Sequence, residues 1–278
     1  MISGPTKDGV TEIVIREVKN CPKRYDSTER VLLIDADSIL HSASYFPEGS
    51  IMEFPDEDSQ IEEAKFRTNN KLQEIQNNVE QYFNITNCIL FVGGGNNFRY
   101  KIYPFYKAHR TIKNPLVPVL KEYIVNELGA ITAEGGEADD YVIDAINLSN
   151  GNCVIGAIDK DVLYHAPNVP FYDYRGHDDV LGEWKMIDER ESRWLRACQL
   201  IIGDTSDGVK GAKGLGKAWC FVNLHEDMTD YQYIKNIFIG YIKSTKGNVE
   251  LAKKEFRLNY KLLKLHSQDE LKEILKWK

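Results

Sequence analysis

Two apolar segments that end in an aspartate restrict the fold of this chain more than any other feature. Residues 31–34 (Val-Leu-Leu-Ile) lead into Asp35, and residues 153–158 (Cys-Val-Ile-Gly-Ala-Ile) lead into Asp159. A third apolar segment, residues 88–92, leads into the three glycines at 93–95. Strands that are apolar at every position are typical of a parallel sheet buried on both faces. We therefore expect an α/β fold.

Segments with helical spacing of apolar residues separate and follow these strands. They predict helices over residues 61–83, 118–128 and 137–148, with a short strand over residues 130–133. After residue 188 the pattern is helical throughout, over residues 192–202, 218–224, 231–242, 251–265 and 268–277. This order predicts a mostly parallel central sheet flanked by helices, with a helical C-terminal region. We divide the chain into residues 1–187 and 188–278.

The composition is that of a globular protein. The chain has 278 residues, of which 42% are hydrophobic and 28% charged. No apolar run approaches the roughly 20 residues that span a bilayer, so we expect no membrane partner. Residues 1–23 lack the apolar core of a signal peptide. The five cysteines include no C-x-x-C pair, which argues against a disulfide framework and a zinc site. We expect a cytoplasmic protein.

Four acidic motifs lie where predicted strands end or predicted helices begin. Acids repel one another, and they gather mainly where hard cations lie between them. Open α/β sheets place their sites at the carboxyl ends of strands. The motifs therefore predict a carboxylate site for divalent cations, suited to two-metal phosphoryl chemistry. The eight acids are Asp35, Glu137, Asp139, Asp140, Asp159, Asp161, Asp204 and Asp207.

Each motif also has a purely structural explanation. Glu137, Asp139 and Asp140 fit an acidic first turn of a helix, which the helix dipole favours. Asp159 and Asp161 fit a turn after a strand, and the last pair fits a loop with an N-cap. Only the presence of all four motifs in one chain favours a shared site.

A basic segment offsets the acidic balance of the chain. The formal net charge is −7, and removing the eight site carboxylates from that charge leaves +1. Residues 99–121 contain no acid and are interleaved with aromatic residues. A local basic stripe of this kind is typical of phosphate binding, and a solvated surface is the alternative. Its basic residues are Arg99, Lys101, Lys107, Arg110, Lys113 and Lys121.

A glycine-rich segment at residues 211–217 (G-A-K-G-L-G-K) partly matches the start of a P-loop. A P-loop needs Ser or Thr next and a strand before it, whereas this chain has Ala218 and a polar loop. We expect instead a turn between helices whose backbone N–H groups approach a phosphate. The residues that support this interpretation are Lys210, Lys213, Gly214, Gly216 and Lys217.

Taken together, these motifs resemble the phage 5′→3′ exonuclease and flap endonuclease family. Residues 33–37 are similar to its first strand and metal acid, and residues 97–99 and 106–110 to its F-R and Y-K-x-x-R segments. Residues 136–140 match its E-A-D-D motif and residues 159–161 its D-x-D motif. Residues 203–207, followed by 211–217, match its G-D-x-x-D motif and helix-three-turn-helix. The resemblance covers about residues 31–265, in family order.

The resemblance implies a PIN-like 5′ nuclease fold and a magnesium-dependent nuclease. Its expected substrates are DNA 5′ ends, nicks or flaps, and RNA primers in RNA–DNA hybrids, in a phage-infected bacterial host. Two Mg²⁺ ions, replaceable by Mn²⁺, are expected. Asp35, Glu137 and Asp139 would hold one. Asp140 belongs to the same acid set and would lie just behind the ligands. The second ion would be held or oriented by Asp159, Asp161, Asp204 and Asp207, partly through water. We expect a monomer.

The resemblance also assigns roles to the basic residues. Lys107 and Arg110 would offset charge on the scissile phosphate, and Tyr106 would stack on an unpaired base. Arg99 would contact DNA as part of a short clamp near residues 99–117. A helix-three-turn-helix at about residues 200–224 would grip duplex phosphates through the glycine-rich turn, together with a K⁺ ion.

One departure from the family pattern leaves alternatives open. Family members often carry a metal-binding aspartate just after the second strand, where this chain has only glycines at 93–95. A non-catalytic DNA-binding relative is therefore one alternative. A PIN-like ribonuclease is another, although the glycine-rich turn argues against it because such a module positions duplex.

Overall fold

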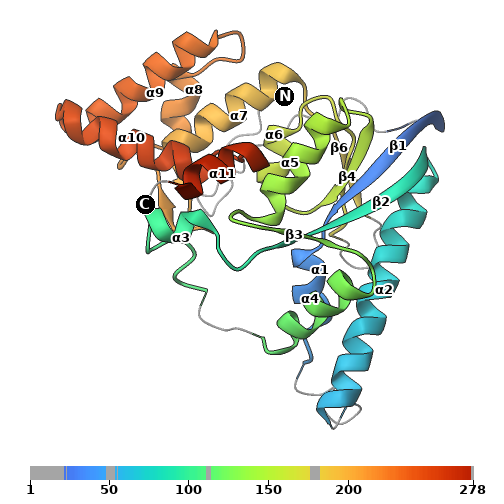
Figure 1. The fold of residues 1–278 in the computed structure, drawn as a ribbon. Helices are drawn as coiled ribbons and strands as arrows, with labels where there is room; N and C mark the ends of the chain where they lie inside the picture. The colour runs from blue at the N-terminus through green and yellow to red at the C-terminus, as the bar shows by residue number, and fades with distance from the viewer. Residues whose placement is uncertain are drawn as a thin grey trace.

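A six-stranded sheet lies at the centre of the molecule (Figure 1). The computed structural model describes residues 24–47, 56–110, 114–175 and 182–276, with the single residues Pro22 and Phe54. The strand order is β3-β2-β1-β4-β5-β6, and every pair is parallel except β5 with β6. The prediction of a mostly parallel sheet is confirmed. The strands are β1 (Asp26–Asp35), β2 (Phe83–Gly93), β3 (Ile131–Ala133), β4 (Cys153–Ala157), β5 (Phe171–Asp173) and β6 (Glu183–Lys185).

Strand β1 is apolar at successive positions because it has a core on each side. Leu33 belongs to one core, whereas Leu32 and Ile34 belong to the other. Helices α1 (Asp37–Ala43), α2 (Glu57–Glu80) and α4 (Leu116–Asn126) contribute to the second core. Helices α5 (Ala138–Leu148) and α6 (Lys160–His165) contribute to the first. Because β1 also lies between β2 and β4, its last residue is held at the middle of the sheet edge.

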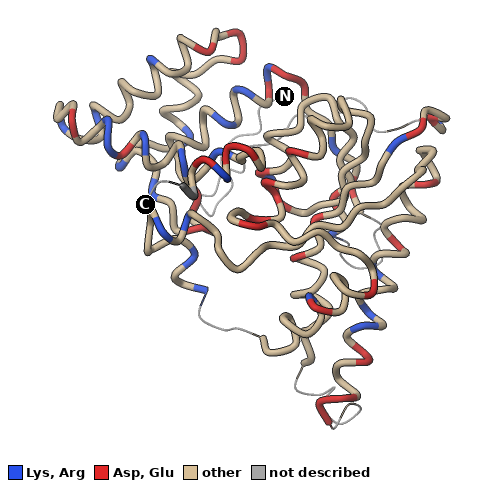
Figure 2. The backbone as a smooth tube through the Cα atoms, in the orientation of Figure 1, with Lys and Arg blue, Asp and Glu red and all other residues tan. Residues whose placement is uncertain are grey.

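The C-terminal region from residue 188 is mainly helical, as predicted, and has its own core around Ile201, Cys220 and Tyr241. Its last helix returns to the sheet region, where it contacts α3 (Phe98–Ile102) and α5, and Leu271 joins the first core. Figure 2 shows Lys and Arg along α7 and α10 in this region. The elements are α7 (Glu189–Ile202), β7 (Gly203–Asp204), β8 (Val209–Lys210), α8 (Lys217–Asn223), α9 (Asp230–Ser244), α10 (Val249–Leu263) and α11 (Gln268–Lys276).

The β7–β8 hairpin requires glycine at two positions. Gly203 has φ +79°, and a Cβ there would lie 2.2 Å from the backbone nitrogen of Gly211. A Cβ on Gly211 would lie 2.1 Å from the carbonyl oxygen of Ile201. Any side chain would therefore separate the hairpin from the end of α7. This contact fixes where the acids of the hairpin lie.

Several element boundaries differ from the predictions. The helix predicted over residues 61–83 ends at Glu80, and Phe83 instead begins β2 because it pairs with Asp26. The helix α3 and the strands β5 and β6 were not predicted, since each has only three to five residues. Residues 1–21 and 277, for which expectations were given, lie outside the described residues. Within the described residues, no helix combines the length and apolar character needed to cross a membrane.

Candidate active site

Acids from three elements meet at the carboxyl end of the sheet. Asp35 ends β1, Asp159 N-caps α6 just after β4, and Asp139 lies in the first turn of α5. Burial, followed by the charge of Asp37, raises the pKa of Asp35 to about 7. Burial and then the charges of Asp35 and Asp159 raise the pKa of Asp139 well above its usual range. Oδ1 of Asp139 is buried without a hydrogen-bond partner among the described residues. A cation would relieve this repulsion.

A second group of acids lies on α6 and the β7–β8 hairpin. Asp159 Oδ1 accepts the N–H of Asp161 at 2.8 Å, which caps α6. Burial and then the charges of Asp159 and Asp204 raise the pKa of Asp161 to about 8. Asp204 differs because Lys160 pairs with it at 2.8 Å. Burial raises the pKa of Asp204, but hydrogen bonds from Lys160 and Ser206 outweigh burial and leave that pKa below its usual value.

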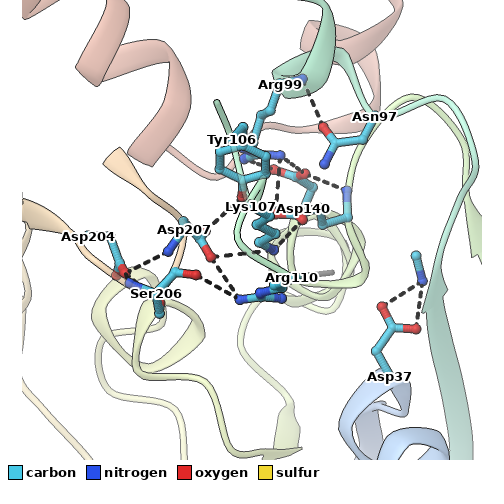
Figure 3. A network of polar contacts seen from close by, with 12 residues as sticks. Asp37, Asn97, Arg99, Tyr106, Lys107, Arg110, Asp140, Asp204, Ser206 and Asp207 are labelled. Atoms are coloured by element: carbon cyan, nitrogen blue, oxygen red, sulfur yellow. Dashed lines mark hydrogen bonds and ion pairs between the residues drawn. The ribbon is translucent and has the colours of Figure 1, made fainter. Parts of the chain in front are cut away.

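Three side chains of the basic stripe reach the remaining acids, Glu137 and Asp207. Figure 3 shows the side chains of Lys107 and Arg110 directed toward Asp207. The Tyr106 hydroxyl lies 2.7 Å from Glu137 Oε2 and 2.7 Å from Asp207 Oδ2. Lys107 Nζ contacts Glu137 and lies 3.6 Å from Asp207 Oδ1. Arg110 Nη2 lies 3.1 Å from the same oxygen. The stripe is thereby attached to the first turn of α5 and to the hairpin.

The structure contradicts the DNA contact predicted for Arg99 and excludes Asp140 as a direct metal ligand. Arg99 is 1% exposed and cannot contact DNA. Its guanidinium donates to Asp140 Oδ2 at 2.7 Å and Oδ1 at 3.0 Å, in a bidentate ion pair. The two oxygens also accept the N–H groups of Glu137 and His266, at 2.9 and 2.8 Å. A carboxylate has about four acceptor positions, so Asp140 has none left for a metal ion. The pair instead holds α3 against α5.

The base-stacking role predicted for Tyr106 is also wrong. Its side chain is buried, with 1% exposure, and it packs with Val209 and Leu262. Its hydroxyl is committed to Glu137 and Asp207. The exposed aromatic residues of the stripe are Tyr100 and Phe105. Sequence alone does not distinguish them, because their exposure depends on the hairpin and α10 packing over the stripe.

No individual site role was expected for Asp37 or Lys160, and Lys121 was expected only as part of the basic stripe. Asp37 begins α1, and both of its carboxylate oxygens accept the N–H of Gly93, at 3.1 and 3.0 Å. Lys121 Nζ on α4 contacts the carbonyl oxygen of the same glycine. The available signal was the position of Asp37 two residues after the acid that ends β1.

The glycine-rich turn lies between the β7–β8 hairpin and α8, whereas a turn between two helices was expected. Gly214 has φ +79° and Gly216 N-caps α8. Lys210 and Lys213 are exposed, and Lys217 begins α8. The strand before the turn is a two-residue member of an antiparallel hairpin, so the strand that a P-loop requires is missing.

The acids of the site have the ligand chemistry that a divalent cation prefers, but their side chains do not converge on one point. Carboxylate oxygens are the ligands that Mg²⁺ and Ca²⁺ prefer. Nevertheless, no group of three or more His, Cys, Asp or Glu side chains within the described ranges could hold a metal ion as placed. Lys107, Lys160 and Tyr106 engage oxygens of Glu137, Asp204 and Asp207 instead. The positive charges thus come from the chain itself.

No family model matches the sequence. The chain is similar to a 5′-3′ exonuclease of Aquifex aeolicus (strain VF5), at 25% identity over 189 residues. The match spans 64% of this chain and 64% of the exonuclease. The fold is similar to a bacteriophage T5 protein co-crystallised with metal ions, with a TM-score of 0.58 and 15% identity over 89% of this chain and 97% of that one. A bacteriophage T5 flap endonuclease variant with DNA and metal ions gives a TM-score of 0.53 at 16% identity, over 89% and 97%.

Proposed function

We propose that this chain, which resembles the 5′ nuclease family in sequence and in fold, is a metal-dependent 5′ nuclease that hydrolyses DNA. The proposed substrates are 5′ ends, nicks and flaps, including RNA primer strands paired with DNA. The proposed cofactor is Mg²⁺, with two ions per site. We further propose that residues 1–187 form the nuclease core and residues 188–278 the DNA-binding region.

One observation carries this proposal. Acids from β1, α5, α6 and the β7–β8 hairpin meet at the carboxyl edge of the sheet, and the basic stripe reaches over them. When bound there, the metal ions would supply an activated water and charge for the leaving oxygen. Burial, followed by neighbouring carboxylates, raises the pKa of Asp35 to about 7 and that of Asp161 to about 8, and a bound cation would favour the charged form of both acids.

The chain's own residues position and neutralise the phosphodiester. Arg110 is about half exposed at 53%, so it can leave Asp207 for a phosphate oxygen. Lys107 is held beside the acids by its backbone, whose N–H donates to the Asp207 carbonyl oxygen at 2.9 Å. Charge placed in advance at that position stabilises charge that develops in the transition state.

The glycine-rich turn is proposed to hold the duplex. Backbone N–H groups at a glycine turn before α8 can approach phosphate oxygens, and the lysines at 210, 213 and 217 add charge there. A K⁺ ion at this turn is part of the same proposal. The acid site and the turn are joined through the β7–β8 hairpin.

The test compares two substitutions on the same helix. Asp139→Asn removes a proposed metal ligand, while Asp144→Asn removes a carboxylate elsewhere on α5. We expect Asp139→Asn to abolish cleavage of 5′-labelled duplex in Mg²⁺ and to retain duplex binding in a gel-shift assay. Asp144→Asn should behave like the wild type.

Each alternative has its own outcome in this assay. Wild-type protein that binds duplex but does not cleave it in Mg²⁺ or Mn²⁺ would indicate a non-catalytic DNA-binding relative. Cleavage confined to RNA would indicate a ribonuclease. Near-wild-type turnover by Asp139→Asn would contradict the metal assignment.

A further inference from the structure

Of the three neighbouring strands β2, β1 and β4, only β2 has no acid of its own where the strand ends. β2 lies beside β1, and it ends at Gly93, whereas β1 ends at Asp35 and β4 leads to Asp159. The three strands are parallel neighbours, so their carboxyl ends lie along one edge. A side chain at position 93 would therefore stand beside the acids of β1 and β4.

The carboxylate of Asp37 lies where that side chain would be. A Cβ built on Gly93 would be only 2.8 Å from Asp37 Oδ2, and the carboxylate carbon would be 3.7 Å away. Both Asp37 oxygens accept the N–H of Gly93. The absence of a side chain on Gly93 thus leaves the space that a carboxylate from α1 enters.

Local contacts hold Asp37 in this position beside the acid site. The backbone N–H of Asp37 donates to Asp35 Oδ1 at 3.1 Å, which links the two acids directly. On the other side, Lys121 Nζ binds the carbonyl oxygen of Gly93. One N–H group leaves most acceptor positions of the Asp37 carboxylate open. Asp139 Oδ1, buried and unpartnered among the described residues, belongs to the same acid group.

We propose that Asp37 is a metal ligand of this site, and that it supplies from α1 the carboxylate that β2 does not provide. This inference rests on the proposed function, because it concerns the same metal site. A purely structural role, in which Asp37 only accepts the Gly93 N–H, is the competing explanation. Asp37→Asn separates the two, because the amide oxygen still accepts that hydrogen bond while the negative charge is lost.

The first measurement is Mn²⁺ affinity of the full chain, by isothermal titration calorimetry without DNA. We expect Asp37→Asn to weaken Mn²⁺ binding by about tenfold or more, at least the loss seen for residues that merely support a ligand. The control is Asp58→Asn, which also removes a first-turn aspartate, but from the exposed start of α2. The control should bind Mn²⁺ like the wild type.

The second measurement moves the carboxylate back to β2. Gly93 is not among the glycines with positive φ, so its backbone accepts an aspartate. In the double variant Asp37→Ala/Gly93→Asp the new Cβ no longer meets the old carboxylate. We expect the double variant to recover most of the Mn²⁺ affinity that Asp37→Ala loses.

The outcomes separate this inference from the proposed function. Wild-type protein that binds no Mn²⁺ contradicts the proposed function itself. Unchanged affinity in Asp37→Asn, with a wild type that does bind, contradicts only the role of Asp37. A lower melting temperature of Asp37→Asn in EDTA with unchanged affinity would show the structural role instead. Should the double variant not fold, the Asp37→Asn result decides alone.

Discussion

Individual acids at the sheet edge differ in which neighbours compensate their charge. Burial raises the pKa of each acid. Arg99 outweighs burial at Asp140, and Lys160 does so at Asp204, so both of these pKa values are lowered, whereas the pKa of Asp35 stays raised. In the sequence these acids are indistinguishable members of short motifs. Their partners lie tens of residues away, as with Asp140 and Arg99 at a separation of 41. The motifs therefore predict the position of the site, but the role of each acid requires the structure.

The raised pKa of Asp35 predicts how metal-free stability depends on pH. An acid whose pKa is higher in the folded state holds its proton longer there, so the free energy of unfolding falls as pH rises from about 4 to about 7. A rise of that size in pKa corresponds to on the order of 4 kcal/mol. Urea unfolding of wild type and Asp35→Asn in EDTA, at pH 5 and pH 8, measures it. We expect the variant to lose less stability between the two values.

The comparison with the variant is necessary because a histidine acts in the opposite direction. Burial lowers the pKa of His165 to about 3, so its contribution to stability rises with pH up to about 6.5. Both proteins contain His165, so its contribution cancels when their free energies of unfolding are subtracted. An equal pH dependence in both proteins would contradict the charge state given to Asp35.

Lys107 and Lys217 should differ in what they contribute. Lys107 lies at the acids, so Lys107→Ala should lower the single-turnover cleavage rate by about 10² or more. Lys217 begins α8 at the proposed duplex-binding turn. Lys217→Ala should weaken DNA binding equally for all DNA sequences. It should also reduce the slope of log affinity against log salt concentration by about one. Equal losses of binding alone, in both variants, would rule out the role proposed for Lys107.

At the level of elements, short helices and strands make contacts with long ones that the apolar pattern of the sequence does not predict. The buried strands were predicted from continuous apolar runs, and the long helices from an apolar periodicity that extends over many residues. Helix α3 has five residues, yet Arg99 in it also donates to the carbonyl oxygens of Leu262 and Lys264, both at 2.9 Å. These contacts join α3, α5 and the end of α10. No periodicity encodes them.

Loss of the Arg99–Asp140 pair should destabilise the whole protein. Asp140→Ala leaves a buried guanidinium without its carboxylate, which costs about 3–5 kcal/mol. The free energy of unfolding in urea, in the presence of EDTA, measures this cost. Asp144→Ala, on the less buried side of the same helix, is the control and should cost far less. A small effect in Asp140→Ala would mean that Arg99 finds another partner.

Across the whole molecule, we expect substrate choice to depend on the short segment between Arg110 and α4. Helix α4 begins at Leu116, and residues 104–109 form turns. Residues 111–113 lie outside the described residues. So few residues remain that we expect an open clamp at 99–117, and no closed arch for threading a strand. The protein should degrade nicked and linear plasmid from 5′ ends, releasing short products, and spare closed circular plasmid.

A blocked flap provides the opposing test. A bulky group on the 5′ end of a long flap stops a threading enzyme but not one with an open clamp. We expect similar cleavage of blocked and unblocked flaps. Strong inhibition by the block, together with preference for the unblocked flap over a nick, would show that the strand threads through an arch.

The interactions of Asp140 also affect the order in which parts of the protein fold during synthesis. Its carboxylate accepts the N–H of His266, and α11 then covers α3 and α5. On the ribosome, the sheet and its acids emerge long before that histidine. The nascent chain can therefore form the sheet early, while the first turn of α5 is fully fixed only after His266 has been added. The sheet would then fold before the contacts that hold the start of α5.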